Sequence, residues 1–331
     1  MNPPRKDYDI VLASGAEHLK SRFEDKGFRV YCCARNYDDK RIFPNGDIYV
    51  RIEDIEELSD RRVVVVQTCT GKIHDGAFFS TADSVVELLL MLDALKRPID
   101  VERKASKNYE TTPIPPPAHV EVVLTFQPFG LQDKAFETGE AVSARWATET
   151  IARNCNKIWV VNPHATRNLE WVQNFMERDL LEYIDVTPEL IKFGAKKFGF
   201  EEYEIVTPDI GGQQRFNVKG FSKERSNSFH VQLTGDLDVR GKNVIVIDDL
   251  TKSGSTLLKT QARLREQGVA DVGLAVVHVL PLIDKGEELL ENLFQNSNGE
   301  IVTTNTVRTA LFCEEHPELT YNIVDSLVGI L

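Results

Sequence analysis

The chain has 331 residues, of which 42% are hydrophobic and 27% charged, a composition typical of an ordinary globular protein, and its length suits two domains better than one. The formal net charge of −12 argues against a nucleic-acid partner, because such proteins usually carry a basic face, although a local basic cluster can still bind a small anion. No apolar run is long enough for a signal peptide or a membrane span, so we expect a cytoplasmic protein with no membrane partner.

Short aliphatic runs alternate with amphipathic stretches along almost the whole chain. The runs that predict strands are residues 9–14, 61–68, 120–126, 157–162, 204–208, 243–249, 272–279 and 300–305. The stretches that predict helices between them include residues 82–97, 140–154 and 257–268. Continuous Val and Ile runs suit strands that are covered on both faces, and repeated βα units favour parallel pairing. The sequence therefore predicts an α/β fold with two doubly wound parallel-sheet domains.

The predicted domains divide near residue 168, after the strand that ends in VVNPHA. We expect an N-terminal α/β domain over residues 1–168 and a C-terminal α/β domain over residues 169–314, with residues 315–331 joining the N-terminal domain. Residues 98–119 interrupt the alternation, since they hold five of the 14 prolines and no periodic apolar pattern. We interpret them as an inserted surface loop, a solvated excursion rather than a regulatory element.

The cysteines give no sign of a metal or disulfide framework. Their number is odd and their spacing contains no CxxC pair. The residues are Cys32, Cys33, Cys69, Cys155 and Cys313. We expect reduced, mostly buried thiols rather than a zinc site.

Two adjacent carboxylates close the predicted strand at 243–249, in the stretch VIVIDDLTKSGSTL. Like charges side by side cost energy unless a cation or a hydroxyl-rich group lies between them. Because ligands of parallel sheets bind beyond the carboxyl ends of the strands, we expect Asp248 and Asp249 to face a crevice. Their oxygens can accept hydrogen bonds from the vicinal hydroxyls of a sugar.

A loop of hydroxyls and glycine follows and leads into a helix that starts near Thr256. The hydroxyls and backbone N–H groups of Ser253, Gly254 and Ser255 can hold a phosphate at the amino end of that helix. Together with the preceding carboxylates, this loop predicts a sugar-phosphate site. The alternative is an ordinary capped helix after a strand with a fortuitous acidic pair, but the full combination favours the sugar phosphate.

Further motifs accompany this stretch in a fixed order. They are IFPNGDIYVRI (42–52), VVELLLMLDALKR (85–97), QD (132–133) with GEAVSAR (139–145), NPHA (162–165), VTPDIGGQQR (206–215), FSKERSN (221–227) and IVTTNTV (301–307). With VIVIDDLTKSGSTL they resemble the ribose-phosphate pyrophosphokinase family, the PRPP synthetases, over roughly residues 40 to 330. The resemblance implies that both domains have the phosphoribosyltransferase-type fold.

The resemblance also implies a reaction and its site residues. The family transfers the β,γ-pyrophosphoryl group of ATP to the C1 hydroxyl of ribose 5-phosphate, giving PRPP and AMP with Mg²⁺ as cofactor. The residues that match the family's catalytic pair are Lys223 and Arg225. The residues that match its ribose 5-phosphate site are Asp209, Asp248, Asp249, Lys252, Ser253, Gly254, Ser255 and Thr256.

On the nucleotide side, the resemblance assigns residues from three segments. The residues that match the family's ATP-binding positions are Phe43, Asn45, Asp47, Gln132 and Asp133, and His164 matches a magnesium or ATP-phosphate contact. In the family the first segment reaches the site of a neighbouring subunit, so a homo-oligomer, a dimer or higher, is implied. Taken alone, the Lys-x-Arg pair reads as a solvated charged loop and the histidine as a structural residue; only their place among the motifs favours the functional roles.

The chain departs from the family pattern mainly on this nucleotide side. Leu131 stands where the family has an arginine that meets the ATP phosphates, and Asn162 and Pro163 replace an Asp-Leu pair before the histidine. Lys134 or Arg145, on the same motif as Leu131, could supply the missing charge.

The ribose side is nearly intact. There, Lys252 replaces an acidic residue and Ser255 a glycine.

Two alternatives from other classes follow from this asymmetry. One is a non-catalytic, regulatory member of the family that assembles with active subunits. The other is a phosphoribosyltransferase that consumes PRPP. The retained Lys223 and Arg225 argue against the first, while the FPNGD segment and the two-domain length argue against the second.

Overall fold

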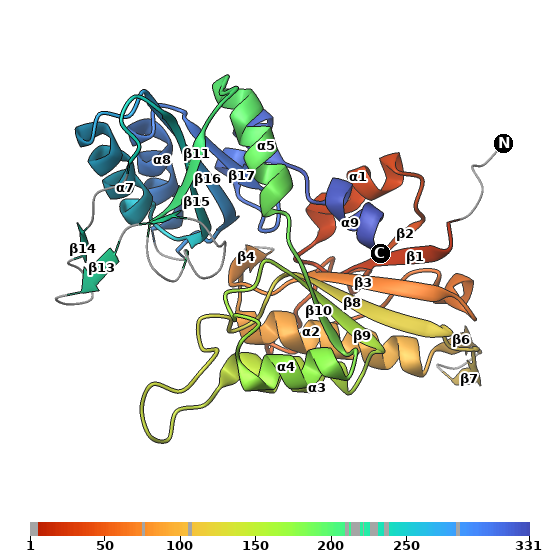
Figure 1. Cartoon of the computed structure of the whole chain (residues 1–331). Coiled ribbons are helices and arrows are strands. Elements are labelled where there is room, and N and C mark those ends of the chain that lie inside the picture. The colour runs from red at the N-terminus through yellow and green to blue at the C-terminus, as the bar shows by residue number, and fades with distance from the viewer. Residues whose placement is uncertain are drawn as a thin grey trace. The chain divides into compact units, whose positions relative to one another are not determined.

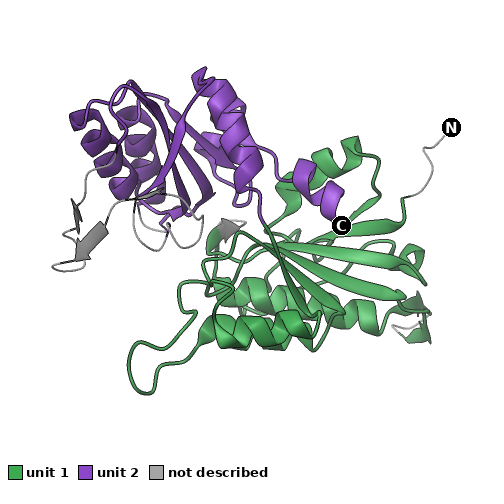
Figure 2. Cartoon of the chain, in the orientation of Figure 1, with its two compact units in different colours: residues 1–184 green, residues 185–331 purple. Residues whose placement is uncertain are grey.

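The computed structural model describes residues 6–74, 77–104, 108–208, 212, 219–220, 222–225, 231–234, 238–282 and 285–331. The chain forms two compact units, unit 1 over residues 1–184 and unit 2 over residues 185–331 (Figure 2). Each unit is built around a six-stranded parallel sheet, and helices pack on it (Figure 1). The predicted α/β fold with two parallel-sheet domains is confirmed.

The sheet of unit 1 has the strand order β10-β9-β8-β3-β1-β2, and each neighbouring pair is parallel. Its strands are β1 (Tyr8–Leu12), β2 (Val30–Cys32), β3 (Arg62–Thr68), β8 (His119–Phe126), β9 (Lys157–Val161) and β10 (Leu181–Ile184). The run Val63–Val66 in β3 is fully buried on both faces of the sheet, as the unbroken aliphatic pattern predicts.

The helices of unit 1 are α1 (Lys20–Asp25), α2 (Thr81–Lys96), α3 (Ser143–Ala152) and α4 (Glu170–Glu177). Of these, α2, α3 and α4 lie on one face of the sheet (Figure 1). The α2 helix begins with a capping box, in which Ser80 and Asp83 each bond the other's backbone N–H. Its side chains Leu88, Met91 and Leu95, three and four residues apart, are fully buried against the sheet.

The described part of unit 1 also contains antiparallel hairpins formed by short strands, and short 3₁₀ turns. The hairpins pair β4 (Lys72–His74) with β5 (Ala77–Phe79), and β6 (Ile99–Arg103) with β7 (Tyr109–Pro113); the turns cover Glu17–Leu19 and Ile55–Leu58. The β6–β7 hairpin lies in the segment predicted as an irregular loop. It is exposed at each strand position, as expected, but it has regular structure because Ile99 and Val101 alternate with polar residues, a period-2 pattern that the prediction overlooked.

The sheet of unit 2 has the order β12-β11-β15-β16-β17-β18, again parallel throughout. Its strands are β11 (Glu204–Thr207), β12 (Lys219–Gly220), β15 (Asn243–Thr251), β16 (Asp271–Val279), β17 (Ile301–Thr304) and β18 (Thr320–Tyr321). A separate antiparallel hairpin joins β13 (Ser222–Arg225) and β14 (Val231–Thr234).

The helices in the fully described segments of unit 2 are α5 (Thr187–Phe198), α7 (Ser255–Glu266), α8 (Gly286–Asn296) and α9 (Val324–Ile330), with a π turn at Leu311–Glu315 and a 3₁₀ turn at Pro317–Leu319. The sheet lies between α5 on one face and the pair α7 and α8 on the other (Figure 1). Phe198 of α5 packs so closely on β16 that a Cβ at Gly273 would lie 2.3 Å from its ring. A glycine is therefore needed there.

The division between the units differs from the predicted domain boundary near residue 168. Strand β10 pairs in parallel with β9 and adds a sixth strand to the sheet of unit 1, which moves the division to Ile184. Unit 2 extends to Leu331, whereas the sequence placed residues 315–331 with the N-terminal domain. The reason is local, since β18 pairs with β17 and Asn305 donates its backbone N–H to the carbonyl of Tyr321.

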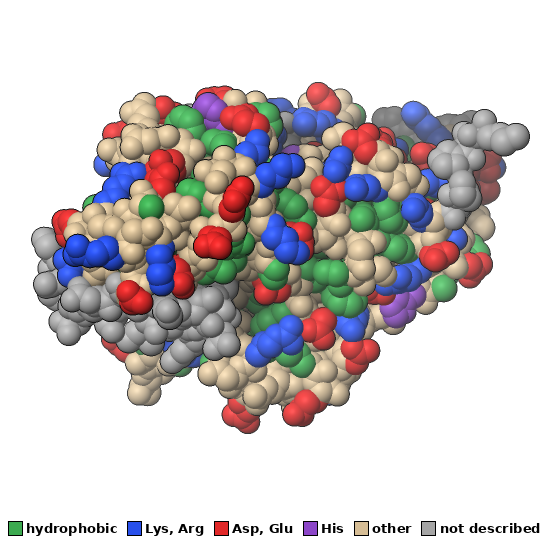
Figure 3. Space-filling model, turned by 45° about the horizontal axis from the view of Figure 1, so that its top comes forward, with side chains coloured by type: hydrophobic (Ala, Val, Ile, Leu, Met, Phe, Trp, Pro, Cys, Tyr) green, Lys and Arg blue, Asp and Glu red, His purple; other side chains and the backbone are tan. Residues whose placement is uncertain are grey.

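The following features concern the surface charge, the hydropathy of the helices and the state of the cysteines. On the face shown in Figure 3, basic and acidic side chains are interspersed rather than gathered by sign. Among the described residues, no helix is both long and apolar enough to cross a membrane. All five cysteines are free thiols. Burial raises the pKa of Cys33 and of Cys155 to about 12, so these two thiols are protonated and unreactive at neutral pH.

Candidate functional site

Asp248 and Asp249 lie near the carboxyl end of β15, which ends at Thr251 in the sheet of unit 2. The strand continues to Thr251, two positions beyond the predicted end, because Leu250 and Thr251 still pair with β16. Asp249 is only 3% exposed, while Asp248 is half-buried and accepts the backbone N–H of Asp249 at 3.0 Å. Successive residues of a strand project to opposite faces, so the two carboxylates present oxygens on both sides of the strand end.

The loop after β15 is closed by short-range hydrogen bonds. Thr251 Oγ1 accepts the backbone N–H of Gly254 at 2.9 Å, and Ser253 Oγ lies 3.3 Å from Ser255 Oγ. Gly254 has φ +70°, and a Cβ on it would lie 2.4 Å from Leu293 Cδ1 of α8. The turn therefore requires glycine at this position both for its backbone conformation and for its contact with α8.

The same glycine precedes the first residue of α7, close to the predicted helix start. Within the described residues, no side chain caps the amino end of α7 and its first turn contains no acidic residue. The N–H of Ser255 donates only a long bond of 3.5 Å to Ser253 Oγ, and the N–H groups of this turn together with the helix dipole favour an anion. Lys252 and Ser255 are exposed on the loop, so an ammonium group and a hydroxyl stand beside the same end of the helix. This end of α7 can accept a phosphate.

For three predicted residues of unit 2, Asp209, Lys223 and Arg225, the structure describes at most the backbone. Asp209 lies outside the described residues. The backbones of Lys223 and Arg225 lie in β13, opposite Leu233 and Val231 of β14. The Lys-x-Arg segment that reads from sequence as a charged loop is thus one strand of a hairpin.

In unit 1, the first predicted nucleotide segment forms a tight hairpin at residues 41–49. The N–H of Phe43 donates to the carbonyl of Asp47, and the N–H of Gly46 to that of Phe43, each at 2.8 Å. Asn45 Nδ2 donates to Asp47 Oδ2 at 2.6 Å, and both side chains are exposed at the tip. The half-buried ring of Phe43 packs edge-on against that of Tyr49 at 5.7 Å.

The second predicted segment, Gln132 and Asp133, lies in the connection between β8 and α3. Gln132 accepts the hydroxyl of Ser143 at 2.6 Å, and the carbonyl of the buried Asp133 accepts the indole N–H of Trp171 at 2.9 Å. These bonds join the segment to the amino ends of both α3 and α4.

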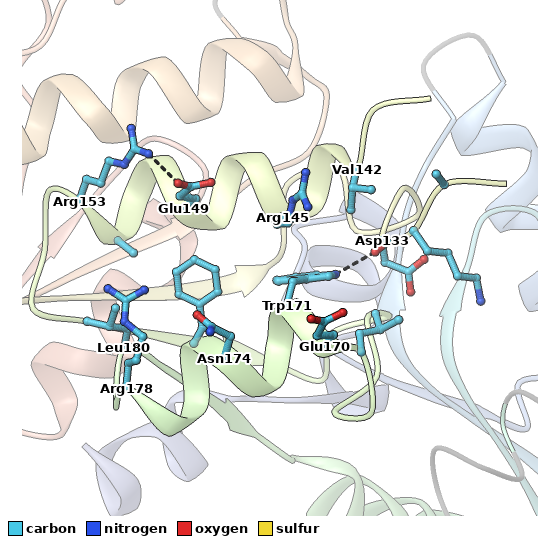
Figure 4. A pocket seen from close by; sticks show the side chains of 15 residues that line it. Asp133, Val142, Arg145, Glu149, Arg153, Glu170, Trp171, Asn174, Arg178 and Leu180 are labelled. Carbon is cyan, nitrogen blue, oxygen red and sulfur yellow. Dashed lines mark hydrogen bonds and ion pairs between the residues drawn. The ribbon is translucent and has the colours of Figure 1, made fainter. Parts of the chain in front are cut away.

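A groove of about 780 Å³ opens along these two helices (Figure 4). Its walls include Asp133, Lys134, Arg145 and Trp171. The two cations named from sequence as replacements for the missing arginine therefore line one groove with Asp133, while Leu131 is 42% exposed.

The predicted metal contact, His164, follows β9 and is half-buried. Asn162 between them has φ +37° and donates its N–H to the carbonyl of Ile184 at 2.9 Å, so the turn is held to the neighbouring strand. Over the described ranges, no group of three or more His, Cys, Asp or Glu side chains is placed to hold a metal ion. A protein cage for a metal is thus absent from this part of the chain.

Sequence reasoning missed three residues that shape these segments. Thr251 accepts the N–H of Gly254, Leu293 packs over that glycine, and Trp171 bonds the backbone of Asp133. Only Thr251 had a local signal, a hydroxyl three residues before a glycine at a helix start. Leu293 and Trp171 act through contacts with residues distant in sequence, which a local sequence pattern does not predict.

Comparisons with known proteins agree with this geometry. A family model described as "Phosphoribosyl transferase domain" matches residues 196–313, which lie within unit 2 and contain β15, the loop and α7. The ribose-phosphate pyrophosphokinase of Pyrococcus furiosus is 27% identical over 310 residues, 91% of this chain and 94% of that protein. That of Methanosarcina mazei is 27% identical over 284 residues, 81% of this chain and 80% of that protein.

This chain is a relative of the ribose-phosphate pyrophosphokinases. The resemblance read from the sequence motifs is therefore confirmed over most of the chain. Among solved structures, the phosphoribosylpyrophosphate synthetase of Mycobacterium smegmatis aligns with a TM-score of 0.68 and 21% identity, covering 98% of this chain and 97% of that one. This likeness supports the fold, and it accounts for both units rather than for unit 2 alone.

Proposed function

We propose that this protein is a ribose-phosphate diphosphokinase, which transfers the pyrophosphoryl group of ATP to C1 of ribose 5-phosphate and releases PRPP and AMP. The observation that carries the proposal is the arrangement at the end of β15: two carboxylates, then a glycine turn that opens onto the uncapped amino end of α7. The relatives named ribose-phosphate pyrophosphokinase, which align over most of their length, make this reaction the first to test.

Each part of this arrangement has a defined role in the proposal. The loop 252–256 binds the 5-phosphate, because backbone N–H groups and the helix dipole favour a dianion there. Asp248 and Asp249 accept hydrogen bonds from the ribose hydroxyls and fix the ring. Held at both ends, the sugar keeps its C1 hydroxyl in one orientation, which lowers the entropy cost of the reaction.

The chemistry itself needs no covalent intermediate. The C1 oxygen bonds to the β-phosphorus, the bond from that phosphorus to the oxygen bridging it to the α-phosphate breaks, and AMP leaves with the electron pair while the hydroxyl proton is released. Lys223 and Arg225 neutralise charge on the transferred group.

On the nucleotide side, we propose that Phe43, Asn45 and Asp47 bind the adenine and that Gln132 and Asp133 contact the phosphate chain. On the ribose 5-phosphate side, we propose that Asp209 lies near the sugar.

Magnesium enters the proposal with the nucleotide. Mg²⁺ keeps several waters and is commonly held by one or two protein groups plus substrate phosphates, so the lack of a protein cage among the described residues fits this mode. His164 is the residue proposed to contact it or the ATP phosphates. When bound, the ion would offset negative charge on the phosphates.

The proposal also includes the cellular compartment and the oligomeric state of the protein. Free thiols at all five cysteines suit a reducing compartment, which supports a cytoplasmic protein. The hairpin 41–49 has an exposed tip whose polar side chains bond each other, which suits a contact with a second copy of the chain. We therefore propose a homo-oligomer.

The test is product stoichiometry with ATP and ribose 5-phosphate as the two substrates. We expect AMP and PRPP in equal amounts, and neither product when one substrate is withheld. If no AMP forms but a nucleobase and PRPP react, the protein is a phosphoribosyltransferase. If it is inactive alone but raises the turnover of an active relative, it is a regulatory subunit. Either result would overturn the proposal.

A further inference from the structure

A buried group of charged and polar side chains in unit 1 has no role in the sites above. Arg41 is 4% exposed, Glu87 1% and Gln67 0%. Gln67 belongs to β3 and Glu87 to α2, and Ser14 follows the end of β1, so the group sits at the carboxyl ends of two central strands. Buried charges are costly unless they are paired, so a cluster of this kind calls for an explanation.

Glu87 is held in place by neutral donors. Its Oε2 accepts the hydroxyl of Ser14 at 2.6 Å and the side-chain amide of Gln67 at 2.8 Å, and its Oε1 accepts the backbone N–H of Ser14 at 3.3 Å. Lys72 donates to the same serine hydroxyl at 2.7 Å. The carboxylate is therefore fixed relative to the sheet before any contact with Arg41 is considered.

Arg41 forms an ion pair with this fixed carboxylate, at a distance too long for a hydrogen bond. Its Nη1 lies 4.0 Å from Glu87 Oε1, and its Nη2 donates to Glu17 Oε1. Its Nε and Nη1 are buried with no hydrogen-bond acceptor among the residues that the structure describes. Optimising stability alone would satisfy those donors or replace the ion group by apolar side chains, so this arrangement favours a role in fixing position.

What Arg41 positions is the hairpin that it begins. Its carbonyl accepts the N–H of Tyr49 at 2.8 Å, and Ile42 bridges to Ile48 in the next step along the hairpin. The backbone bonds between Phe43 and Asp47 then close the tip. The guanidinium and the tip thus belong to one hydrogen-bonded piece, with one end buried in the sheet and the other exposed.

We propose that Arg41 is a positioning residue: through its buried pairing with Glu17 and Glu87 it fixes the angle at which the hairpin presents Phe43, Asn45 and Asp47 to the base of the nucleotide. This inference rests on the proposed function. It concerns nucleotide affinity and base selectivity, and it leaves the ribose site and the transfer step unaffected.

The test compares the wild type with three variants: Arg41→Met, the double variant Arg41→Met/Glu17→Gln, and the control Arg51→Met. Arg51 is an exposed arginine just beyond the hairpin whose nearest carboxylate, on Glu53, is 3.8 Å away. For Arg41→Met we expect the KM for ATP to rise about tenfold or more and the preference over GTP to weaken, with kcat and the KM for ribose 5-phosphate within about twofold. Arg51→Met should match the wild type.

The double variant separates positioning from stability. Removing Arg41 alone leaves two carboxylates close together, whereas the double variant removes one of them and should recover the melting temperature. Positioning predicts that its KM for ATP stays high and that the amides of Phe43 and Gly46 exchange faster than in the wild type. Recovery of the ATP KM together with the melting temperature would overturn the inference, as would an unchanged KM in both variants. Failure of the proposed function would appear separately, as a wild type that forms no PRPP.

Discussion

The loop of unit 2 that we propose binds ribose 5-phosphate and the segments of unit 1 that we propose bind the nucleotide are built in different ways. The loop takes its residues from one run, 248–256, whose geometry is closed by Thr251, Gly254 and the first turn of α7. The proposed nucleotide segments come from three places, the hairpin 41–49, residues 132–133 and His164, and the first two are held by partners distant in sequence. The shape of this loop therefore depends on a few neighbouring residues, Thr251 and Gly254 above all.

A site built from separate segments has more freedom to change. Leu131 is exposed, and the cations Lys134 and Arg145 line the same groove as Asp133, so they can supply the positive charge that Leu131 does not. The difference fits where the sequence departs from the pattern of the family that it resembles: the departures expected to weaken binding fall in unit 1, while the loop of unit 2 is nearly intact.

The largest effect is expected for Gly254→Ala. A left-handed backbone costs alanine about 1–2 kcal/mol, and overpacking against Leu293 costs about 1–3 kcal/mol more. Because the turn must move to relieve both, we expect the Kd for ribose 5-phosphate to rise about a hundredfold by calorimetry. Gly241→Ala is the matched control, since Gly241 has φ +72° and no atom within 4 Å of the added Cβ. Equal affinities in the two variants would show that the loop does not bind the phosphate.

An effect of similar size, on kcat rather than on binding, is expected for Lys223→Ala, which tests whether β13 serves the transfer step. Loss of one charge-assisted contact to the transferred group should lower kcat by about a hundredfold. Binding of ribose 5-phosphate should change little, because the contact belongs to the transition state. Near-normal turnover would remove Lys223 from the mechanism and leave only the ribose loop.

A smaller effect, in the direction of improvement, is expected for Leu131→Arg. An arginine–phosphate contact contributes about 1.5–3 kcal/mol, so restoring it should lower the nucleotide KM by roughly tenfold to a hundredfold. The measurement is a set of saturation curves for several nucleoside triphosphates with both proteins. If the wild type already saturates with ATP at low micromolar concentration and the arginine changes nothing, unit 1 has not lost affinity and the contrast with unit 2 disappears.

The smallest effect is expected from replacing the β6–β7 hairpin, residues 99–113, with a short Gly/Ser turn. Its strands are exposed at each position, so little apolar surface is lost and the melting temperature and kcat should stay close to those of the wild type. Ile99, Val101 and Tyr109 are each at least 50% exposed. A large drop in either quantity would mean that another molecule covers these side chains.

The sequence predicted what local pattern determines. The strands with Val and Ile runs, the helix 82–97 and the turn into α7 were placed within a few residues, because burial and turn chemistry act over short windows. The β6–β7 hairpin was missed because proline content outweighed a two-residue alternation. Strand β10, LEYI, has no aliphatic run and becomes a strand by pairing with β9.

The buried cluster around Glu87 was beyond sequence reasoning altogether. Its members Ser14, Gln67 and Glu87 meet only after the parallel sheet forms, since they lie 20 and 73 residues apart along the chain. Nothing in the motif that contains Arg41 distinguishes it from a solvated arginine. Its burial, and with it the proposed link to the hairpin, required the structure.

The central claim is that the end of β15 binds ribose 5-phosphate, and a calorimetric titration of the wild type and Asp249→Asn tests it most directly. The substitution keeps the volume of a side chain that is 3% exposed, removes its charge and replaces one acceptor oxygen by an NH2 donor. We expect saturable binding by the wild type and a Kd at least about tenfold higher for the variant, with Asp238→Asn, at an exposed position of the same unit, as the unaffected control. Equal affinities in all three proteins, or no binding by the wild type, would contradict the account.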